Sequence, residues 1–290
     1  MQDDTTLYRE TIDNINKYGI SVKKKYGQNF LKDTRVLDKI IAGAQIDSDD
    51  TVLEVGPGLG NLTKELAKIA GRVVAVEIDI NLIEPLKEIL RDYPNVSILQ
   101  GDILDLLEKG LEPIVADKPY KVVANLPYYI TTPIIMGFLE SSNPPQSLTV
   151  MLQKEVAQRM KAAPCTKDYS ALTLAVEYYA DTYLVANVPR NCFIPRPNVD
   201  SAVLRLTRLK ESPVRPINEE FLFKVIKASF AQRRKTLINA LLNAKIGLES
   251  KETVSEALKA MGLADNIRGE TLSLTQFSEL SDILFKSTIN

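Results

Sequence analysis

A glycine-rich loop is the part of the sequence best suited to holding a ligand. Residues 51–55 form a short apolar run, and Gly56, Gly58 and Gly60 follow it directly. Glycine weakens the interiors of strands and helices, so this clustering indicates a backbone that another molecule must approach closely. In an α/β sheet, such a loop lies beyond the carboxyl end of a strand and presents backbone N–H groups to a nucleotide-like ligand. A tight turn without a ligand is the alternative.

The glycine spacing and one acidic residue indicate which ligand the loop would hold. The dinucleotide fingerprint requires G-x-G-x-x-G, whereas this loop reads G-x-G-x-G, with Asn61 at the third glycine position. Glu54, just before the glycines, would repel a phosphate but would suit the amino group of an amino acid moiety. These two features favour S-adenosylmethionine over a dinucleotide. Glu77, at the end of the next apolar run, could bind the ribose hydroxyls of either ligand.

A second segment, Asn125-Leu-Pro-Tyr128, could act on an amino group. It ends another apolar run and offers the amide of Asn125, the carbonyl of Leu126 and the ring of Tyr128. Pro127 has a fixed φ and restricts the preceding residue to an extended conformation, so these acceptors would be held in place. A dehydrogenase has no use for this arrangement, but a methyltransferase that acts on an amino group does.

Methyl transfer to an amino group also fits what the chain lacks. The sequence contains no histidine, which excludes Ser-His-Asp and Cys-His catalysis and the common zinc sites. An amino group on an aromatic ring, such as N6 of adenine, is a weak nucleophile because its lone pair is delocalised into the ring, so an enzyme must orient it and stabilise charge. Hydrogen bonds from N6 to the Asn125 oxygen and the Leu126 carbonyl would do both. Tyr128 and Phe193 could stack on the two faces of a base lifted out of its helix; alternatively, Tyr128 is a rim aromatic and Phe193 a core residue.

Alternating strand and helix patterns predict the scaffold that positions these residues. The pattern indicates an α/β fold, a Rossmann-like doubly wound sheet of seven mostly parallel strands. Asp102 follows the third strand, on the same edge as Glu77, where its carboxylate could accept from an adenine amino group. The strands are expected at residues 51–55, 72–77, 96–100, 120–125, 147–152, 181–188 and 201–209, and helices at 6–18, after Asp33, at 61–70, at 80–91, near 153 and at 169–180.

A linker at residues 212–216 predicts a second domain. Beyond it, helical patterns at 218–231, 234–245, 251–262 and 274–286 indicate a small all-α bundle. We therefore expect a methyltransferase domain over residues 1–210 and a helical RNA-binding domain over 211–290.

Positive charge is concentrated in the middle of the chain. The formal net charge of −1 comprises −6 over residues 1–149, +8 over 150–245 and −3 over 246–290. A basic stripe on a near-neutral protein indicates nucleic-acid binding, although it can also be plain solubility charge. The candidate RNA contacts are Arg233, Arg234 and Lys235, with Lys23, Lys24 and Lys25 as a second cluster.

The composition argues against several other classes. An acidic start and the lack of a long apolar run predict neither a signal peptide nor a membrane span, so we expect a cytoplasmic protein. Cys165 and Cys192 lie in unrelated contexts without C-x-x-C spacing, which predicts neither a disulfide nor a metal site.

The ordered motifs resemble those of the ribosomal RNA adenine dimethyltransferases, most closely the small-subunit 16S type. The resemblance covers about residues 18–245. Its motifs are Gln28-Asn-Phe-Leu31, Glu54-Val-Gly-Pro-Gly-Leu-Gly60, Glu77, Gly101-Asp102, Asn125-Leu-Pro-Tyr128, Gln153-Lys-Glu-Val156, Phe193-Ile-Pro-Arg-Pro-Asn-Val-Asp-Ser201 and Phe230-Ala-Gln-Arg-Arg-Lys-Thr-Leu237.

This resemblance implies a reaction and a site. It implies transfer of two methyl groups to N6 of each of two adjacent adenosines near the 3′ end of 16S rRNA, within the small ribosomal subunit. We expect the protein to act as a monomer. The resemblance assigns contact with S-adenosylmethionine to Asn29, Leu31, Gly56, Glu77, Asp102 and Asn125, and we expect Gln28, Glu54, Gly58, Ile78 and Ile103 in the same pocket.

Three other functions remain open at this point. The 23S rRNA methylases of the macrolide-resistance type are similar, but the Gly-Pro-Gly-Leu-Gly loop, the doubled Tyr128-Tyr129 and residues 230–237 favour the small-subunit type. A nicotinamide dehydrogenase would explain only the glycine loop and Glu77. A non-catalytic RNA-binding assembly factor would explain the basic middle region but not the pocket.

Overall fold

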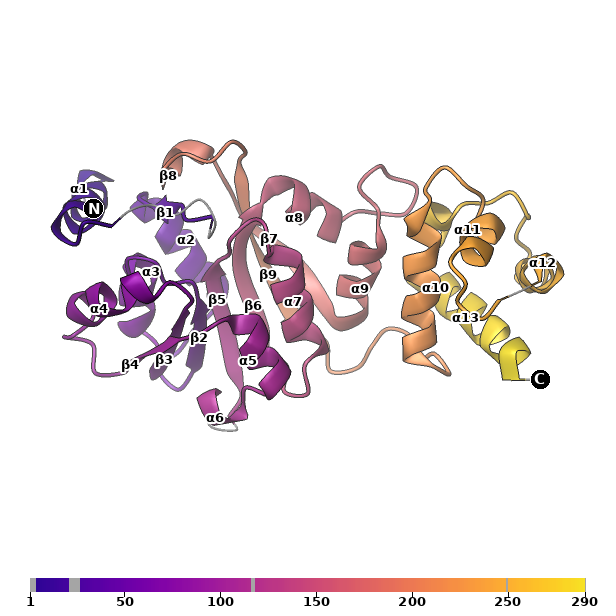
Figure 1. Cartoon of the computed structure of the whole chain (residues 1–290), viewed down its shortest axis with the longest axis horizontal. Helices are drawn as coiled ribbons and strands as arrows, with labels where there is room; N and C mark the ends of the chain where they lie inside the picture. The colour runs from indigo at the N-terminus through magenta and orange to yellow at the C-terminus, as the bar shows by residue number, and fades with distance from the viewer. Residues whose placement is uncertain (1–3, 21–26, 116–117, 249, 290) are drawn as a thin grey trace. The chain divides into compact units, whose positions relative to one another are not determined.

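The computed structural model describes residues 4–20, 27–115, 118–248 and 250–289 (Figure 1). Two compact units make up the chain. The first contains residues 1–157 and 181–208, and the second contains residues 158–180 and 209–290. Within the described residues, no helix is both long and apolar enough to cross a membrane. The candidate RNA contacts Lys23, Lys24 and Lys25 lie outside the described residues.

A seven-stranded sheet forms the centre of the first unit, counted over the described residues, with the strand order β4-β3-β2-β5-β6-β9-β7. The pairs β3–β4, β2–β3, β2–β5 and β5–β6 are parallel, whereas β9 is antiparallel to β6. The predicted doubly wound, mostly parallel sheet is thus confirmed. The strands are β2 Thr51–Val55, β3 Arg72–Glu77, β4 Val96–Gln100, β5 Tyr120–Asn125, β6 Ser147–Gln153, β7 Ala180–Val188 and β9 Ser201–Arg208.

Helices cover both faces of this sheet because its strands are apolar on both sides. The five residues of β2 are all buried, as expected for a strand inside a parallel sheet. The helices α2 and α3 pack through apolar residues such as Ile40 and Leu66 against Val52 and Val123. The other face is covered by α5 and α7, which lie in front of the sheet in Figure 1. The helices are α2 Thr34–Ala44, α3 Asn61–Ala67, α4 Ile80–Ile89, α5 Ile103–Lys109, α6 Glu112–Val115 and α7 Thr131–Glu140.

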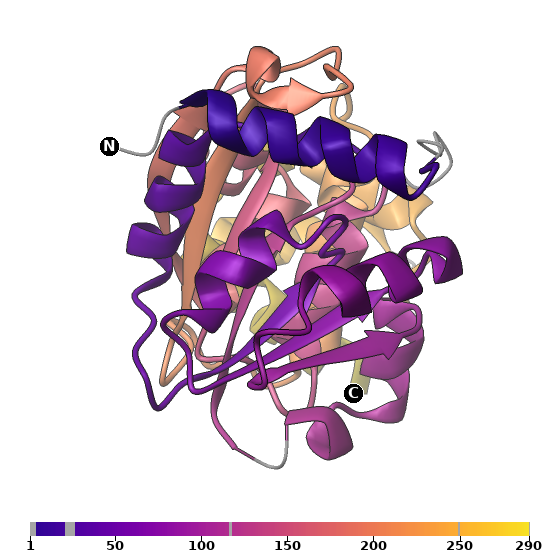
Figure 2. The ribbon, with the colours of Figure 1, turned by 90° about the vertical axis from the view of Figure 1, so that its left-hand side faces the viewer.

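Two further elements lie near the carboxyl edge of the sheet. The helix α1, Asp4–Lys17, passes across the ends of α3 and α4, as Figure 2 shows. The two-residue strands β1, Phe30–Leu31, and β8, Phe193–Ile194, pair antiparallel, with Leu31 opposite Phe193. This pairing places the segment before α2 next to the loop before β9. The paired residues Leu31 and Phe193 are 162 positions apart in the sequence.

The second unit is helical. It contains α9 and the four predicted C-terminal helices, and the turn around Gly269–Thr271 joins two of them. The hydroxyls of Tyr178 and Tyr179 donate to the two carboxylate oxygens of Glu219, at 3.0 and 2.7 Å, and tie residues 158–180 to the C-terminal helices. The helices are α8 Lys154–Met160, which ends in this unit, α9 Ala171–Tyr179, α10 Glu219–Ala231, α11 Leu237–Asn243, α12 Lys251–Ala260 and α13 Leu274–Ile289.

Candidate functional site

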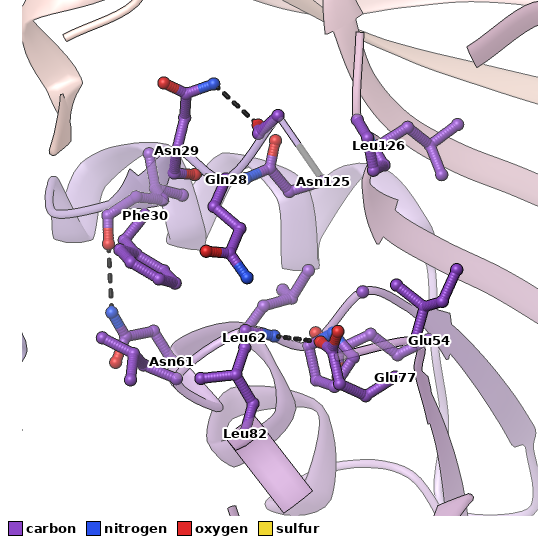
Figure 3. Close-up of a pocket in the computed structure, with 18 of the residues that line it drawn as sticks. Gln28, Asn29, Phe30, Glu54, Asn61, Leu62, Glu77, Leu82, Asn125 and Leu126 are labelled. Atoms are coloured by element: carbon purple, nitrogen blue, oxygen red, sulfur yellow. Dashed lines mark hydrogen bonds between the residues drawn. The ribbon is translucent and has the colours of Figure 1, made fainter. Parts of the chain in front are cut away.

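A pocket opens at the carboxyl ends of β2, β3 and β5, where the sequence predicted it. Its volume is about 830 Å³, including space open to solvent. Figure 3 shows Gln28 and Asn29 on one side of the pocket and Asn61, Leu62 and Leu82 on the other. The predicted residues that line it are Gln28, Asn29, Leu31, Glu54, Gly56, Gly58, Glu77, Ile78, Asn125 and Leu126.

The glycine loop needs its glycines for two separate reasons. Gly56 and Gly58 have φ angles of +69° and +61°, in the left-handed region that side chains disfavour. A Cβ atom on Gly58 would lie 3.2 Å from Cε1 of Phe30, whereas one on Gly56 would meet no atom within 4 Å among the described residues other than its chain neighbours. The space beside Gly56 is therefore available to a ligand. The loop then enters α3 at Asn61.

Glu77 connects the end of β3 to the glycine loop. One carboxylate oxygen accepts from the Gly58 backbone N–H at 3.3 Å, and the other accepts from the Asp79 N–H at 2.8 Å. Only 4% of Glu77 is exposed. Burial raises the pKa of Glu77, and the two backbone hydrogen bonds oppose that rise. The side chain is thus held in place at the wall of the pocket.

Glu54 is a buried carboxyl, and one of its two oxygens lacks a hydrogen-bond partner among the described residues. It is 1% exposed, and its Oε2 accepts no hydrogen bond from the described residues. Burial raises the pKa of Glu54 to about 8; the nearby Glu77 adds to this rise, and the Thr63 hydroxyl opposes it. A buried carboxyl in this condition is stabilised by a cation beside it. The ammonium group of an amino acid moiety would supply that cation.

The amide of Asn125 has a defined orientation. Its Nδ2 donates to the backbone carbonyl of Asn29 at 3.0 Å, so its Oδ1 is the atom presented as an acceptor. Asn29 is itself fixed, because its side-chain nitrogen donates to the Gly27 carbonyl at 2.9 Å. The Leu126 N–H donates to the Met151 carbonyl at 3.0 Å, which anchors the next peptide to β6. The acceptors at the end of β5 are therefore rigidly placed.

A second pocket of about 400 Å³, again partly open, adjoins the first. Asp102 and Ile103 line it, as predicted for the far end of the ligand, and Asp102 also caps α5 by accepting from the Leu104 N–H at 2.9 Å. Both pockets share Gly56, Ile78, Pro127 and Tyr129. The two pockets therefore lie side by side, with Glu54 in the lining of the first and Asp102 in the lining of the second.

Two aromatic residues, Tyr128 and Phe193, were predicted to stack on the target base. Among the described residues, neither Tyr128 nor Phe193 lines either pocket. The Tyr128 hydroxyl lies 2.6 Å from the Ser201 Oγ. Phe193 is 2% exposed and packs in the apolar cluster that contains Leu31. Their stacking on a target base stays a prediction.

Several lining residues were not predicted. Tyr129 lines both pockets and is 58% exposed; the sequence noted it only as half of a tyrosine pair. Asn61 was noted only as a departure from the dinucleotide fingerprint. Leu62 and Leu82 belong to helices whose apolar periodicity gave no sign that they also face a ligand.

The predicted RNA contacts in the second unit differ in their surroundings. Arg233 donates to the Lys167 carbonyl at 2.7 Å and pairs with Glu270 at 3.2 Å. Arg234 and Lys235 are exposed in the turn between α10 and α11. The sequence predicted Arg234 and Lys235 at the start of a helix over 234–245, whereas they lie before α11, and it did not predict the ion pair that holds Arg233.

A sheet of this topology, with a glycine loop, two acidic strand ends and a fixed asparagine at one edge, defines a Rossmann-like methyltransferase. The chain belongs to the ribosomal RNA adenine dimethylase family, whose model matches residues 19–286. The predicted family is thereby confirmed.

Individual relatives agree with this family. The chain is 55% identical to Ribosomal RNA small subunit methyltransferase A of Lachnoclostridium phytofermentans, over 95% of this chain and 96% of that one. It is similar in structure to a dimethyladenosine transferase from Plasmodium falciparum, with a TM-score of 0.73 and 29% identity, over 87% of this chain and 95% of that one. It is also similar to the 23S rRNA methyltransferase ErmE, with a TM-score of 0.67 and 30% identity, over 89% and 100% of the two chains.

Proposed function

We propose that this enzyme uses S-adenosylmethionine to dimethylate N6 of two adjacent adenosines near the 3′ end of 16S rRNA in the small ribosomal subunit. The fixed orientation of the Asn125 amide beside the acidic pocket carries this proposal. The name of the 55% identical relative, which specifies the small subunit, supports the choice of substrate.

The pocket suits S-adenosylmethionine better than a dinucleotide. When bound, this cofactor supplies a methyl group that its sulfonium centre has already activated. Glu54 is buried, and its Oε2 has no hydrogen-bond partner in the described part of the chain, so it would pair with the amino group of the cofactor. Glu77 would accept from the ribose hydroxyls, and Asp102 from the adenine amino group. Gly56 leaves the backbone open to the ligand.

The residues at the end of β5 would prepare the target amine. The Asn125 Oδ1 and the Leu126 carbonyl would accept hydrogen bonds from N6–H and turn the nitrogen lone pair outward. Such acceptors act most strongly when the nitrogen gains positive charge, so they stabilise the transition state more than the ground state. The N6 proton becomes acidic at that stage, so solvent can take it and no histidine is needed.

The second unit would provide the RNA contacts. Arg234 and Lys235 are exposed in one turn, where they could follow the phosphate backbone. We propose that the first unit carries out methyl transfer and the second unit binds RNA, in a monomer that acts in the cytoplasm on ribosomal subunits.

Methylation of separated subunits tests the substrate. The purified enzyme, with tritiated S-adenosylmethionine, should label small subunits that lack the modification and should leave large subunits unlabelled. Label in 23S rRNA alone would favour the alternative function, which the similarity to ErmE supports. Calorimetry with S-adenosylmethionine and with NAD tests the cofactor separately, and binding of NAD alone would contradict the proposed pocket.

A further inference from the structure

We propose that the N-terminal helix α1 sets the cofactor affinity of the pocket through one buried hydrogen bond, from Asn61 to Thr11. This inference depends on the proposed S-adenosylmethionine site. It assigns Asn61 and Thr11 as positioning residues that act on the glycine loop and on residues 28–31.

Asn61 joins three segments of the first unit. It is the first residue of α3, directly after the glycine loop, it lines the cofactor pocket, and it is 8% exposed. Its Nδ2 donates to the Thr11 Oγ1 at 3.0 Å and to the Leu31 carbonyl at 3.1 Å. The second of these bonds is visible in Figure 3. One amide group therefore fixes the glycine loop to both α1 and β1.

Thr11 needs its hydroxyl for this contact. The side chain is fully buried, and its Oγ1 donates to the Leu7 carbonyl at 2.7 Å while it accepts from Asn61. Valine would fill nearly the same volume but would leave an Asn61 N–H unpaired in a buried place, which is costly. Thr11 does not line either pocket among the described residues, so its influence on a ligand must pass through Asn61.

Apart from the bond to Thr11, the polar contacts of α1 with α3 and α4 among the described residues are weak. A polar cavity of about 740 Å³, partly open to solvent, lies between α1, α2 and α3, and Asn61 lines this cavity as well as the cofactor pocket. The ion pair of Lys64 with Glu10 is long, at 3.9 Å, and that of Lys17 with Glu88 is exposed; such pairs stabilise weakly. In the part of the chain that the structure describes, the bond from Asn61 to Thr11 is thus a buried polar contact between α1 and α3, in addition to the apolar packing of Leu7.

The connection extends to the residues that bind the ligand. Asn61 donates to the carbonyl of Leu31. In the same segment, the ring of Phe30 lies against Gly58, and the carbonyl of Asn29 accepts from the Asn125 amide. If the Asn61 amide changes its orientation, residues 28–31 lose the hydrogen bond that Asn61 donates to the Leu31 carbonyl. The expected result is weaker cofactor binding in a folded protein.

Calorimetry on the full chain tests this inference. Thr11→Val should raise the dissociation constant for S-adenosylmethionine about three- to tenfold, the range expected for a hydrogen bond left unmade. Thr11→Ser, which keeps the hydroxyl, should bind as the wild type does. Lys17→Ala is the matched control on the same helix and should also bind normally.

Two further variants separate a specific effect from general destabilisation. Ser255→Ala removes the partly buried hydrogen bonds to Asp265 in the second unit, and it should lower the melting temperature without changing cofactor affinity. Thr11→Val combined with Asn61→Ala should bind no more weakly than Asn61→Ala alone, since Thr11 acts through Asn61. Wild-type affinity in Thr11→Val, or additive losses in the double variant, would overturn the inference. A wild-type protein that fails to bind S-adenosylmethionine would overturn the proposed function and the inference with it.

Discussion

The side-chain nitrogen of Asn125 donates to the backbone carbonyl of Asn29 at 3.0 Å, across 96 residues of sequence. This bond determines which atom of the Asn125 amide remains an acceptor. It also connects the strand end that would orient the target amine with the segment that lines the cofactor pocket. One hydrogen bond thus joins the residue that would orient the target amine to the segment that would bind the cofactor.

Asn125→Ala should reduce turnover much more than cofactor binding. The lost acceptor is needed mainly in the transition state, so the rate constant kcat should fall about 10²- to 10³-fold, by analogy with a single oxyanion-hole donor. The dissociation constant for S-adenosylmethionine should rise less than about tenfold, because only one hydrogen bond to Asn29 is lost. Single-turnover methylation and calorimetry measure the two quantities. A variant with more than half of the wild-type rate would rule out the role assigned to Asn125.

Glu77→Ala should act on cofactor binding. Removal of a charged partner of the ribose should cost about 1.5–3 kcal/mol, which raises the dissociation constant roughly ten- to a hundredfold. The Gly58 N–H also loses its acceptor, so thermal unfolding must be measured in parallel to show that the variant is folded. Unchanged affinity in calorimetry would place Glu77 outside the ligand contacts.

Glu54→Gln should change how stability depends on pH in the absence of cofactor. Burial raises the pKa of Glu54 from 4.5 to about 8, so the folded state holds this proton more tightly than the unfolded state. The resulting stabilisation is complete below about pH 4.5 and is lost as the pH rises through about 8. The unfolding free energy of the wild type should therefore fall relative to Glu54→Gln across this range. Urea titrations at several pH values measure the difference, and a constant difference would contradict the burial of a protonated Glu54.

Arg234→Ala with Lys235→Ala should weaken binding to small ribosomal subunits. Each lost phosphate contact should reduce the slope of log affinity against log salt by about 0.7–0.9. Arg233→Ala is the informative comparison, because its ion pair with Glu270 predicts a loss of stability and a smaller change in slope. Cofactor affinity should be unchanged in all of these variants. An unaltered salt slope in the double variant would assign the RNA contacts to other residues.

Regular elements of the fold were predictable because the strands are short continuous apolar runs and the helices show a helical period of apolar residues. Strands 72–77, 96–100 and 120–125 were predicted at their observed bounds. The helix expected at 234–245 begins instead at Leu237, because the Thr236 side chain caps it by accepting from the Asn239 N–H. The two-residue strands β1 and β8 are too short to show a period, and their pairing depends on contacts between distant parts of the chain.

The site could be predicted in part, because the carboxyl ends of parallel strands lie at the same edge of the sheet, and the glycine loop follows one of these ends. Local sequence does not show which way a side chain points within a loop. Tyr129 lines both pockets, whereas Tyr128, its neighbour, contacts Ser201. The link from Thr11 to Asn61 spans 50 residues and leaves no local pattern.

Nucleoside analysis of the product tests the central claim most directly. Small subunits that lack the modification should be incubated with the enzyme and S-adenosylmethionine, and their 16S rRNA should then be digested and separated by mass spectrometry. The account predicts N6,N6-dimethyladenosine at two adjacent positions near the 3′ end, and almost none with Asn125→Ala. A methyl group found only on another base, on ribose or in 23S rRNA would contradict it.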